Sequence, residues 1–345
     1  MRFTQEDELE GMKFAVVGCG AIAEAYFLPV LTTRRDLCSK LWLIDPNPAR
    51  LQVMANQFSI DAAASSLDQA LDAIDAAVIA TPHDTHFQLS TTLIAAGKHI
   101  FCEKPLTTTL EDGAELVAAA EQANVVLMTN NWRRNCPAFR EIKRIIDAGC
   151  LGRPVALSWT EGRKFAWPTK SGFYFTQRPR NNLPPPGILL DVGSHVVDLL
   201  CWWLGSDPQM VECRTDSFGG PEARATLVLD FAGARAQVDL SYYQKLTNTY
   251  CIRFERGCIT GVSGEEHRFT LSRPGRKLAI VRLPHGRINI LGHATCMLTN
   301  FVGAIGGANR PLVTGRDVLP SIRTISEAYR NAQRFDEPWL PRFEK

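Results

Sequence analysis

The 345-residue sequence lacks the features that mark membrane proteins and secreted disulfide-rich proteins. It contains no apolar run long enough to span a bilayer. Its start, MRFTQEDELEG, holds four acidic residues and no apolar run, so we expect no secretory signal. The ten cysteines include no C-x-x-C pair and several lie inside apolar runs, which favours reduced structural thiols. We therefore expect a cytoplasmic protein without a membrane partner.

The sequence also lacks the signatures of metal and nucleic-acid binding. Its histidines and cysteines do not recur at metal-ligand spacing, so we expect no metal site. The net charge is only +2, but residues 131–187 carry 11 basic and 3 acidic side chains. A solvated basic face is one interpretation of this excess, and attraction of an anionic substrate is the other. No binding motif accompanies the basic residues, so no nucleic-acid partner is expected.

Length and patterning predict two domains, over residues 1–130 and 131–345. In the first, short apolar runs alternate with longer amphipathic segments, the βαβ rhythm of a parallel sheet. The expected strands are 13–18, 40–45, 76–81, 99–104 and 125–130, and the expected helices are 22–32, 48–57, 66–73, 85–96 and 110–122. In the second, runs such as ATLVLDF and RAQVDLSYY follow one another without intervening helices, which predicts a largely antiparallel sheet. An amphipathic helix over about 315–334 closes the chain, and its packing against the first domain is left open.

The first predicted strand runs directly into a glycine-rich turn. Residues 18–23 read Gly-Cys-Gly-Ala-Ile-Ala, the G-x-G-x-x-A form of the dinucleotide fingerprint, between a strand and a helix. Gly18 permits the tight turn, and Gly20 lets the backbone approach a pyrophosphate at the positive end of the helix. Ala23 allows close packing of helix on strand. We therefore predict that Gly18, Gly20, Ala21 and Ile22 bind a dinucleotide.

The second predicted strand ends at Asp45, where an acidic residue would hydrogen-bond the adenosine ribose hydroxyls. A carboxylate there repels a 2′-phosphate, which favours NAD over NADP. Arg50 lies close enough to stack on adenine or to admit a phosphate, so NADP stays open. The alternative is that Asp45 serves only the turn before the two prolines that follow.

Two further strand ends carry polar residues. The third strand runs into Thr81-Pro82, with His86 nearby, and the fourth ends at Glu103-Lys104-Pro105. Loops at the carboxyl ends of parallel strands line the ligand crevice of a doubly wound sheet. We therefore place Thr81, Pro82, His86, Glu103 and Lys104 at the cofactor, with Lys104 near the nicotinamide and a cis bond before Pro105 as a hypothesis.

The segment ILLDVGSHVVDLLCWWLG, residues 188–205, predicts an apolar helix that ends at Gly205. Asp191 is its expected N-cap. Asp191, His195 and Asp198 form one narrow polar stripe, which is expected to face a cleft. Taken alone, the stripe fits equally well a cap and a partly buried histidine.

Together these motifs resemble the glucose–fructose oxidoreductase, inositol dehydrogenase and rhizopine catabolism family (Gfo/Idh/MocA). The likeness continues through residues 130–154 and extends to the closing helix. Membership implies a Rossmann domain followed by an open, mainly antiparallel β-sheet domain, an α/β plus α+β architecture. It also implies that Lys104 polarises the reacting oxygen, that His195 is the acid/base, and that Asp191 contacts substrate and orients the histidine.

The sequence departs from the family pattern before Asp191, where Pro-Pro-Pro-Gly at 184–187 replaces a glycine run. The preceding stretch is aromatic and basic, with side chains suited to a sugar face or an anionic group. Simple packing of these aromatics is the alternative. The candidate substrate contacts besides Asp191 and His195 are Arg134, Trp167, Tyr174 and Arg178.

The predicted function is an NAD-dependent dehydrogenase or ketoreductase for a secondary alcohol of a sugar, cyclitol, sugar acid or nucleotide sugar. One alternative is a glycoside hydrolase that oxidises, eliminates and re-reduces without net NADH. Another is a non-catalytic sensor of the same fold. Because an antiparallel sheet leaves one broad face without helices, we expect a homodimer or homotetramer.

Overall fold

A computed structural model describes residues 11–165, 187–283 and 289–336, which form two compact units. Unit 1 comprises residues 11–135 and 289–319, and unit 2 comprises 136–165, 187–283 and 320–336. Unit 1 therefore includes a second segment, residues 289–319, which begins about 150 residues after its first segment ends. The domain limits 1–130 and 131–345 stay a prediction.

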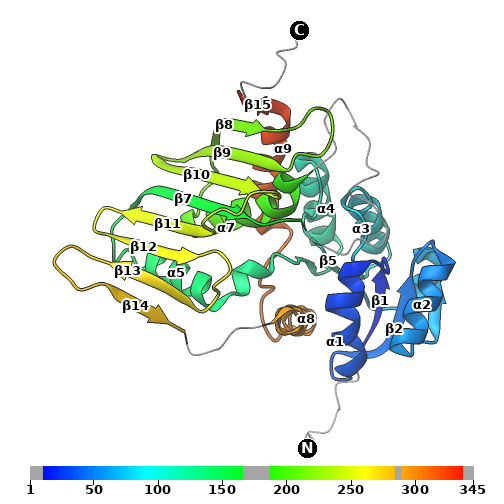
Figure 1. The fold of residues 1–345 in the computed structure, drawn as a ribbon. Helices are drawn as coiled ribbons and strands as arrows, with labels where there is room; N and C mark the ends of the chain where they lie inside the picture. Colours follow the sequence, from blue (N-terminus) through cyan, green and yellow to red (C-terminus); the bar gives the residue numbers. More distant parts are fainter. Residues whose placement is uncertain (1–10, 166–186, 284–288, 337–345) are drawn as a thin grey trace, which may run out of the picture. The chain divides into compact units, whose positions relative to one another are not determined.

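Unit 1 contains a six-stranded sheet in the order β3-β2-β1-β4-β5-β6, with every pair parallel (Figure 1). The strands are β1 (Met12–Val17), β2 (Cys38–Ile44), β3 (Ala62–Ala64), β4 (Ala76–Ile79), β5 (His99–Cys102) and β6 (Leu127–Thr129). This is the classic order of a dinucleotide-binding sheet. All four residues of β4 are buried, as expected for a parallel strand covered on both faces.

The helices of unit 1 are α1 (Leu28–Thr33), α2 (Pro48–Phe58), α3 (His86–Ala95), α4 (Leu110–Gln122) and α8 (Ile290–Ile305). The short turns are η1 (Ala23–Phe27), η2 (Leu67–Gln69), η3 (Leu71–Ala73), η4 (His83–Thr85), η5 (Trp132–Asn135) and η7 (Arg316–Val318). The prediction of one helix over 66–73 was wrong, because η2 and η3 are separate 3₁₀ turns. The strand β3 was not predicted.

Helix α8 belongs to unit 1 although it follows the strands of unit 2 in the sequence. It packs against η1, η5, α1 and β5. Phe301 on α8 lies with its ring centroid 6.1 Å from that of Phe14 and 5.6 Å from that of Phe101, on two strands of the sheet. The sheet of unit 1 is thus covered in part by a segment from the far end of the chain.

Unit 2 contains a nine-stranded sheet in the order β14-β13-β12-β11-β7-β10-β9-β8-β15. Its strands are β7 (Pro154–Gly162), β8 (Gln209–Thr215), β9 (Arg224–Phe231), β10 (Ala234–Ser241), β11 (Thr249–Phe254), β12 (Gly257–Val262), β13 (Arg268–Ser272), β14 (Ala279–Arg282) and β15 (Gln333–Arg334). The pairs are antiparallel except β7 with β10 and β8 with β15. The predicted mainly antiparallel sheet is confirmed.

The helices of unit 2 are α5 (Pro137–Asp147), the π-type turn η6 (Leu189–Gly193), α7 (Ser194–Leu204) and α9 (Leu319–Asn331). The core between α5, α7 and the sheet is aromatic: the rings of Phe139, Trp159, Trp203 and Tyr250 pack with centroids 5.2 to 6.3 Å apart. Burial alternates along β9, because one face of the sheet packs on these helices and the other does not.

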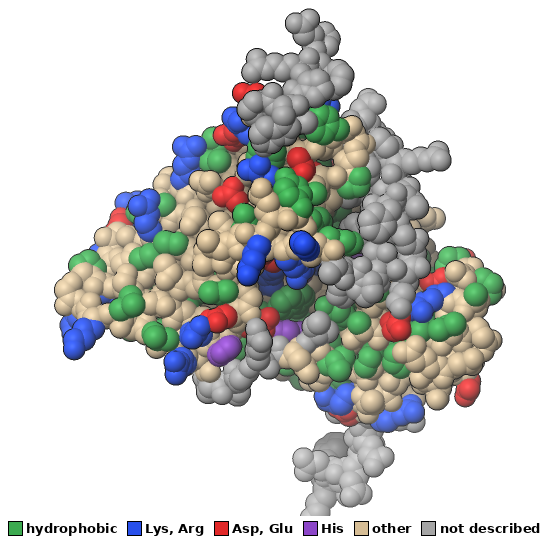
Figure 2. All heavy atoms as spheres, in the orientation of Figure 1, with side chains coloured by type: hydrophobic (Ala, Val, Ile, Leu, Met, Phe, Trp, Pro, Cys, Tyr) green, Lys and Arg blue, Asp and Glu red, His purple; other side chains and the backbone are tan. Residues whose placement is uncertain are grey.

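The other face of this sheet carries hydrophobic side chains between charged and polar ones (Figure 2). Val155, Val211, Val262 and Ile280, on four of its strands, are 37 to 57% exposed. In the described part of the chain, every helix is too short or too polar to cross a bilayer.

Candidate active site

The glycine-rich turn of unit 1 is shaped by two different requirements. Gly18 has φ +92°, and a Cβ there would lie 2.7 Å from the carbonyl oxygen of Ala80 and 2.8 Å from Cγ2 of Thr81. Only glycine fits this position. A Cβ at Gly20, in contrast, would meet no atom within 4 Å. Packing therefore explains Gly18, but no contact among the described residues requires glycine at position 20.

Asp45 fixes this turn from the end of β2. One carboxylate oxygen accepts a hydrogen bond from the backbone N–H of Cys19 at 2.8 Å, and the other accepts from the N–H of Asn47 at 2.8 Å. Asp45 therefore stabilises the turn that follows it, as the alternative interpretation expected. The same carboxylate also hydrogen-bonds the glycine-rich turn at Cys19. Negative charge beside that turn disfavours a phosphate on the adenosine ribose.

Arg50 is held by groups of the same turn. Its Nε donates to the carbonyl oxygen of Cys19 at 2.5 Å, and its guanidinium pairs with Glu24 at 2.5 Å. Because Glu24 neutralises this cation, Arg50 is less suited to a 2′-phosphate. Burial raises the pKa of the neighbouring Cys19 thiol to about 12, so Cys19 remains a neutral packing residue.

Three strand ends of unit 1 are tied together around Lys104. Glu103 is 9% exposed, accepts from Nδ2 of Asn130 at 2.7 Å and accepts from the backbone N–H of Lys104 at 3.1 Å. The Lys104–Pro105 bond is cis, which confirms that hypothesis. Lys104 itself is half-buried. Glu103 thus braces the loops after β5 and β6 and thereby sets the backbone that carries Lys104.

His86 is a buried brace in the same place. Its Nδ1 lies 2.8 Å from the carbonyl oxygen of Pro105 and its Nε2 lies 3.0 Å from that of Thr81. Burial lowers the pKa of His86. At 1% exposure, His86 links the loops after β4 and β5, one of which carries Lys104.

In unit 2, the helical segment that carries Asp191 begins earlier than expected. The segment starts at Ile188, and the backbone N–H of Asp191 donates to the carbonyl oxygen of Gly187 at 3.1 Å. Asp191 therefore lies inside the segment, and the prediction of Asp191 as N-cap was wrong. The π-type turn η6 holds Asp191 one turn before His195, and such turns are frequent at functional sites.

Asp191 and His195 are both half-buried, one turn apart. Asp198, the third member of the predicted polar stripe, is 1% exposed and belongs to the core. The segment ends at Gly205, whose φ of +63° makes it the C-cap that the sequence predicted.

Tyr242 is a site residue that the sequence analysis missed. Its hydroxyl donates a hydrogen bond to a carboxylate oxygen of Asp191. The Tyr242 ring packs edge-on against Phe165, with centroids 5.0 Å apart. It directly follows β10, in a strand that the sequence predicts, but the pattern SYY does not distinguish it from its neighbour Tyr243.

The predicted substrate contacts are only partly described. Trp167, Tyr174 and Arg178 lie outside the described residues. Arg134 is 5% exposed and donates to the carbonyl oxygen of Asp317 at 3.0 Å, within unit 1. This contact holds η7, so any contact of Arg134 with a substrate stays a prediction.

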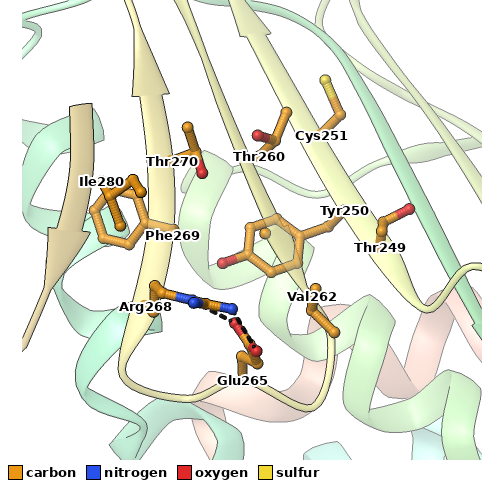
Figure 3. A pocket seen from close by; sticks show the side chains of 11 residues that line it. Thr249, Tyr250, Cys251, Thr260, Val262, Glu265, Arg268, Phe269, Thr270 and Ile280 are labelled. Carbon is orange, nitrogen blue, oxygen red and sulfur yellow. Dashed lines mark hydrogen bonds and ion pairs between the residues drawn. The ribbon is translucent and has the colours of Figure 1, made fainter. Parts of the chain in front are cut away.

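A hollow of about 410 Å³ lies on the sheet of unit 2, across β11 to β14 (Figure 3). Arg268 at this hollow is bound by both carboxylate oxygens of Glu265, at 2.7 and 2.8 Å. Neither Asp191, His195 nor Tyr242 lines it. We assign it no part in the chemistry.

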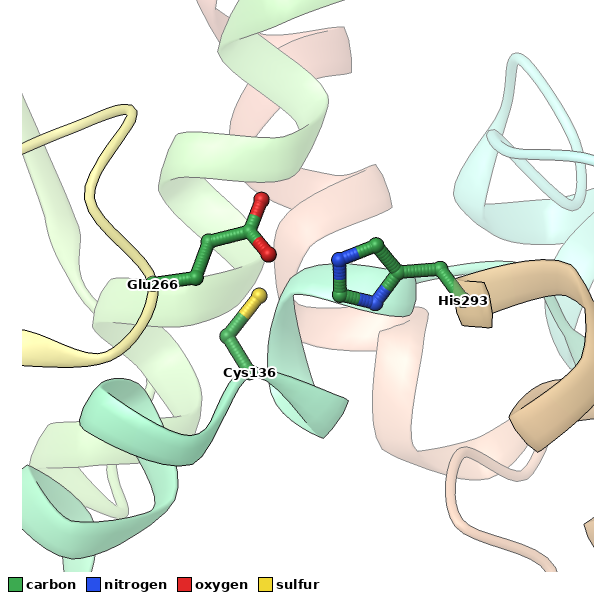
Figure 4. Close-up of side chains that lie close together, drawn as sticks. All are labelled: Cys136, Glu266 and His293. Carbon is green, nitrogen blue, oxygen red and sulfur yellow. The ribbon is translucent and has the colours of Figure 1, made fainter. Parts of the chain in front are cut away.

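Two side chains that bind metals in other proteins point toward each other in unit 2. They are the thiol of Cys136, just before α5, and the carboxylate of Glu266, just before β13 (Figure 4). His293, also drawn there, belongs to unit 1. Two donors make no zinc site, which needs at least three protein ligands. The expectation of no metal therefore stays a prediction.

The glycine turn, Asp45 and the 3-2-1-4-5-6 sheet define a dinucleotide-binding oxidoreductase. Residues 12–131 match the family model described as "Oxidoreductase family, NAD-binding Rossmann fold", and residues 139–260 match the "GFO/IDH/MocA C-terminal domain". The chain belongs to the Gfo/Idh/MocA family, as its motifs suggested. It is an NAD(P)-dependent oxidoreductase acting on CH–OH groups.

Similar proteins cover most of the chain. The 1,5-anhydro-D-fructose reductase of Ensifer adhaerens is 30% identical over 73% of this chain and 75% of its own. The scyllo-inositol 2-dehydrogenase (NAD(+)) of Bacillus subtilis (strain 168) is 25% identical over 93% and 94%.

Among solved structures, the WlbA dehydrogenase of Bordetella pertussis, in complex with NADH and UDP-GlcNAcA, superimposes with a TM-score of 0.76 at 22% identity, covering 93% of this chain and 95% of the other. It supports the fold. The relatives are dehydrogenases and reductases, so the hydrolase and sensor alternatives are not favoured.

Proposed function

We propose that this enzyme transfers hydride between nicotinamide C4 and a secondary alcohol or ketone of a sugar-like substrate. The observation that carries the proposal is the half-buried Asp191–His195 pair, with Tyr242 on Asp191, on a mostly apolar helix. An apolar helix needs no such pair for stability. Reduction of an anhydro-ketose and oxidation of a cyclitol by the two sequence relatives support this substrate class.

The proposed cofactor residues fall into two groups: those that contact the dinucleotide, and those that position the loops around it. Gly20, Ala21 and Ile22 approach the pyrophosphate. Asp45 accepts hydrogen bonds from the ribose hydroxyls and, at the same time, from the backbone N–H of Cys19 in the glycine-rich turn. Thr81, Pro82, Glu103 and His86 shape the strand ends, with Glu103 and His86 acting as braces. Asp45 and the Arg50–Glu24 pair together favour NAD over NADP.

Three side chains of this chain serve the reaction. Bound NAD supplies the hydride acceptor at C4. Lys104 donates to the reacting oxygen through its ammonium group, and His195 takes or returns the hydroxyl proton. Asp191 contacts the substrate and orients His195, while Tyr242 keeps the carboxylate of Asp191 in place. Arg134, Trp167, Tyr174 and Arg178 are proposed substrate contacts.

The test is NADH formation from NAD by the purified protein across polyols, sugar acids and nucleotide sugars. Lys104→Ala should lower kcat on any active substrate by at least about 10²-fold, with the Kd of NADH nearly unchanged. Lys98→Ala, a half-buried lysine just before β5, is the matched control and should retain full activity. Equal turnover by Lys104→Ala and wild type would refute the proposed role.

We further propose a cytoplasmic homodimer or homotetramer. The ten cysteines, all among the described residues, form no disulfide bond, which suits a reducing compartment. Val155, Val211, Val262 and Ile280, on four strands of the nine-stranded sheet, are exposed, and exposed hydrophobic side chains on a sheet favour a partner. Solution scattering should give at least twice the monomer mass of 38.3 kDa, and a monomer mass would contradict the assembly.

A further inference from the structure

The start of the helical segment 188–204 is capped by residues from elsewhere in unit 2. Its own first residues provide no side-chain cap. Instead, the backbone N–H of Leu189 donates to Oε1 of Glu222 at 2.9 Å, and the N–H of Ile188 donates to the backbone carbonyl of Glu222 at 3.0 Å. The first N–H groups of a helix have no partner within the helix, so Glu222 supplies what the segment itself lacks.

Tyr329, on α9, completes this cap. Its hydroxyl donates to Oε1 of Glu222 at 2.7 Å and accepts from the N–H of Leu190 at 3.1 Å. Oε1 of Glu222 also accepts from the N–H of Gly187 at 3.0 Å. One carboxylate oxygen and one hydroxyl thus fix the direction of the chain entering the segment.

This cap is tighter and more costly than an ordinary one. Serine, threonine, asparagine and aspartate usually cap helices from the adjacent position at little cost. Here a glutamate 2% exposed is used, and burying a carboxyl group is unfavourable. Gly187 comes so close that its Cβ would lie 2.0 Å from the carbonyl oxygen of Glu222. Such an arrangement is better explained by a requirement to place the backbone of residues 187–190 accurately than by a contribution to the stability of the fold.

The segment so fixed carries the two polar side chains assigned to the reaction. Asp191 follows directly after Leu190, and His195 follows one turn later. A shift of about 1 Å in a reacting group can lower a rate about 10²-fold. We propose that Glu222 and Tyr329 are positioning residues, which hold residues 187–190 so that Asp191 and His195 keep a fixed place. This inference rests on the proposed function of those two residues.

The variants separate positioning from simple loss of stability. Glu222→Gln keeps an amide oxygen that accepts the same hydrogen bonds, whereas Glu222→Met has similar size and no such acceptor. Tyr329→Phe removes only the hydroxyl. Tyr250→Phe is the matched control: Tyr250 is 1% exposed in the same unit, and its hydroxyl has no hydrogen-bond partner among the described residues.

We expect kcat to fall at least about tenfold in Tyr329→Phe and in Glu222→Met. The KM for NAD should stay within about twofold, because unit 1 carries the proposed dinucleotide-binding residues. Glu222→Gln should retain most of the wild-type kcat, and Tyr250→Phe all of it. Unchanged kcat in both Tyr329→Phe and Glu222→Met would overturn the proposal.

Hydrogen exchange gives a readout that needs no substrate. The amides of Leu189 and Leu190 should exchange faster in Tyr329→Phe and Glu222→Met than in wild type or Tyr250→Phe. Unchanged exchange would refute the positioning role even in an active enzyme. If wild type turns over no substrate while exchange changes as expected, the proposed function fails and the cap stands.

Discussion

The helical starts after Gly20 and after Gly187 are built in opposite ways. In unit 1, the segment after the glycine turn begins with no side-chain cap, and a Cβ at Gly20 would touch nothing. In unit 2, the segment from Ile188 is capped by buried Glu222 and by Tyr329, and a Cβ at Gly187 would collide with backbone. Both starts contain a π-type turn, η1 and η6.

This difference is the one expected between a helix start that receives a ligand and one that presents side chains. An anion can approach the N–H groups of the first, since no atom of the described residues lies within 4 Å of where a Cβ of Gly20 would stand. The N–H groups of the second are already satisfied inside unit 2. The protein itself requires a glycine at position 187, and we propose that the ligand requires one at position 20, so a single methyl group at each position should distinguish the two.

The largest effect is expected at Gly187. Gly187→Ala places a Cβ 2.0 Å from the carbonyl oxygen and 2.7 Å from the backbone nitrogen of Glu222. The free energy of unfolding should fall by about 3 kcal/mol or more, because backbone on both sides must move. Urea unfolding measures this loss. Gly220→Ala, where a Cβ meets nothing within 4 Å, is the control and should change stability by no more than about 0.5 kcal/mol. Equal stability of both variants would refute the close approach.

The carboxyl group of Glu222 should also make stability depend on pH. Burial raises the pKa of Glu222 from its ordinary value of 4.5 to about 7. Between these values the folded chain keeps a proton that the unfolded chain has lost, so stability falls as pH rises through this range, by about 3 kcal/mol. The pKa values of Tyr329 and Cys213 are raised, so both stay neutral there.

Glu222→Gln cannot lose this proton. Its unfolding free energy, relative to wild type, should therefore increase by about 3 kcal/mol between pH 4.5 and pH 8, with the change complete near pH 7. Urea unfolding of both proteins at several pH values measures the difference, in which other titrating groups cancel. A difference independent of pH would show that Glu222 titrates normally.

The same contrast explains what the sequence could predict. The order of unit 1 followed from local signals: apolar strand runs, the glycine turn and Asp45 at the next strand end, each within a few residues. Lys104 and the Asp191–His195 pair could be proposed as site residues, because each lies in a short motif. These signals depend on neighbours along the chain, so no knowledge of tertiary contacts was needed.

Contacts between distant segments could not be found in this way. Glu222 lies 33 residues from Leu189, and Tyr329 lies 139 residues from Leu190. Asp191 was therefore mistaken for the cap, since the true cap is remote. Helix α8 was missed for the same reason, because its apolar residues find their partners on strands near the other end of the chain.

The next largest effect is expected for a substitution at Gly20, at the helix start in unit 1. Gly20→Ala should leave the unfolding free energy within about 0.5 kcal/mol, because the added Cβ crowds no atom of the residues that the structure describes. The Kd of NADH should rise at least about tenfold, since the added methyl group stands where the backbone meets the pyrophosphate. Quenching of protein fluorescence by NADH measures this Kd. An unchanged Kd would mean that the dinucleotide does not approach Gly20, and the contrast between the two helix starts would fail.

The smallest effect concerns the hydroxyl that holds Asp191 from outside its helix. Tyr242→Phe removes the donor to the Asp191 carboxylate and leaves the ring packed on Phe165. Because Asp191 is half-buried and its segment is fixed by Glu222, we expect kcat to fall only about fivefold, equivalent to about 1 kcal/mol. Tyr243→Phe, at the next position and 49% exposed, is the matched control and should behave as wild type. If kcat falls as much in Tyr242→Phe as in Tyr329→Phe, the hydrogen bond from Tyr242 contributes as much to catalysis as the remote cap. Asp191 would then be positioned both through its side chain and through the backbone of its helical segment.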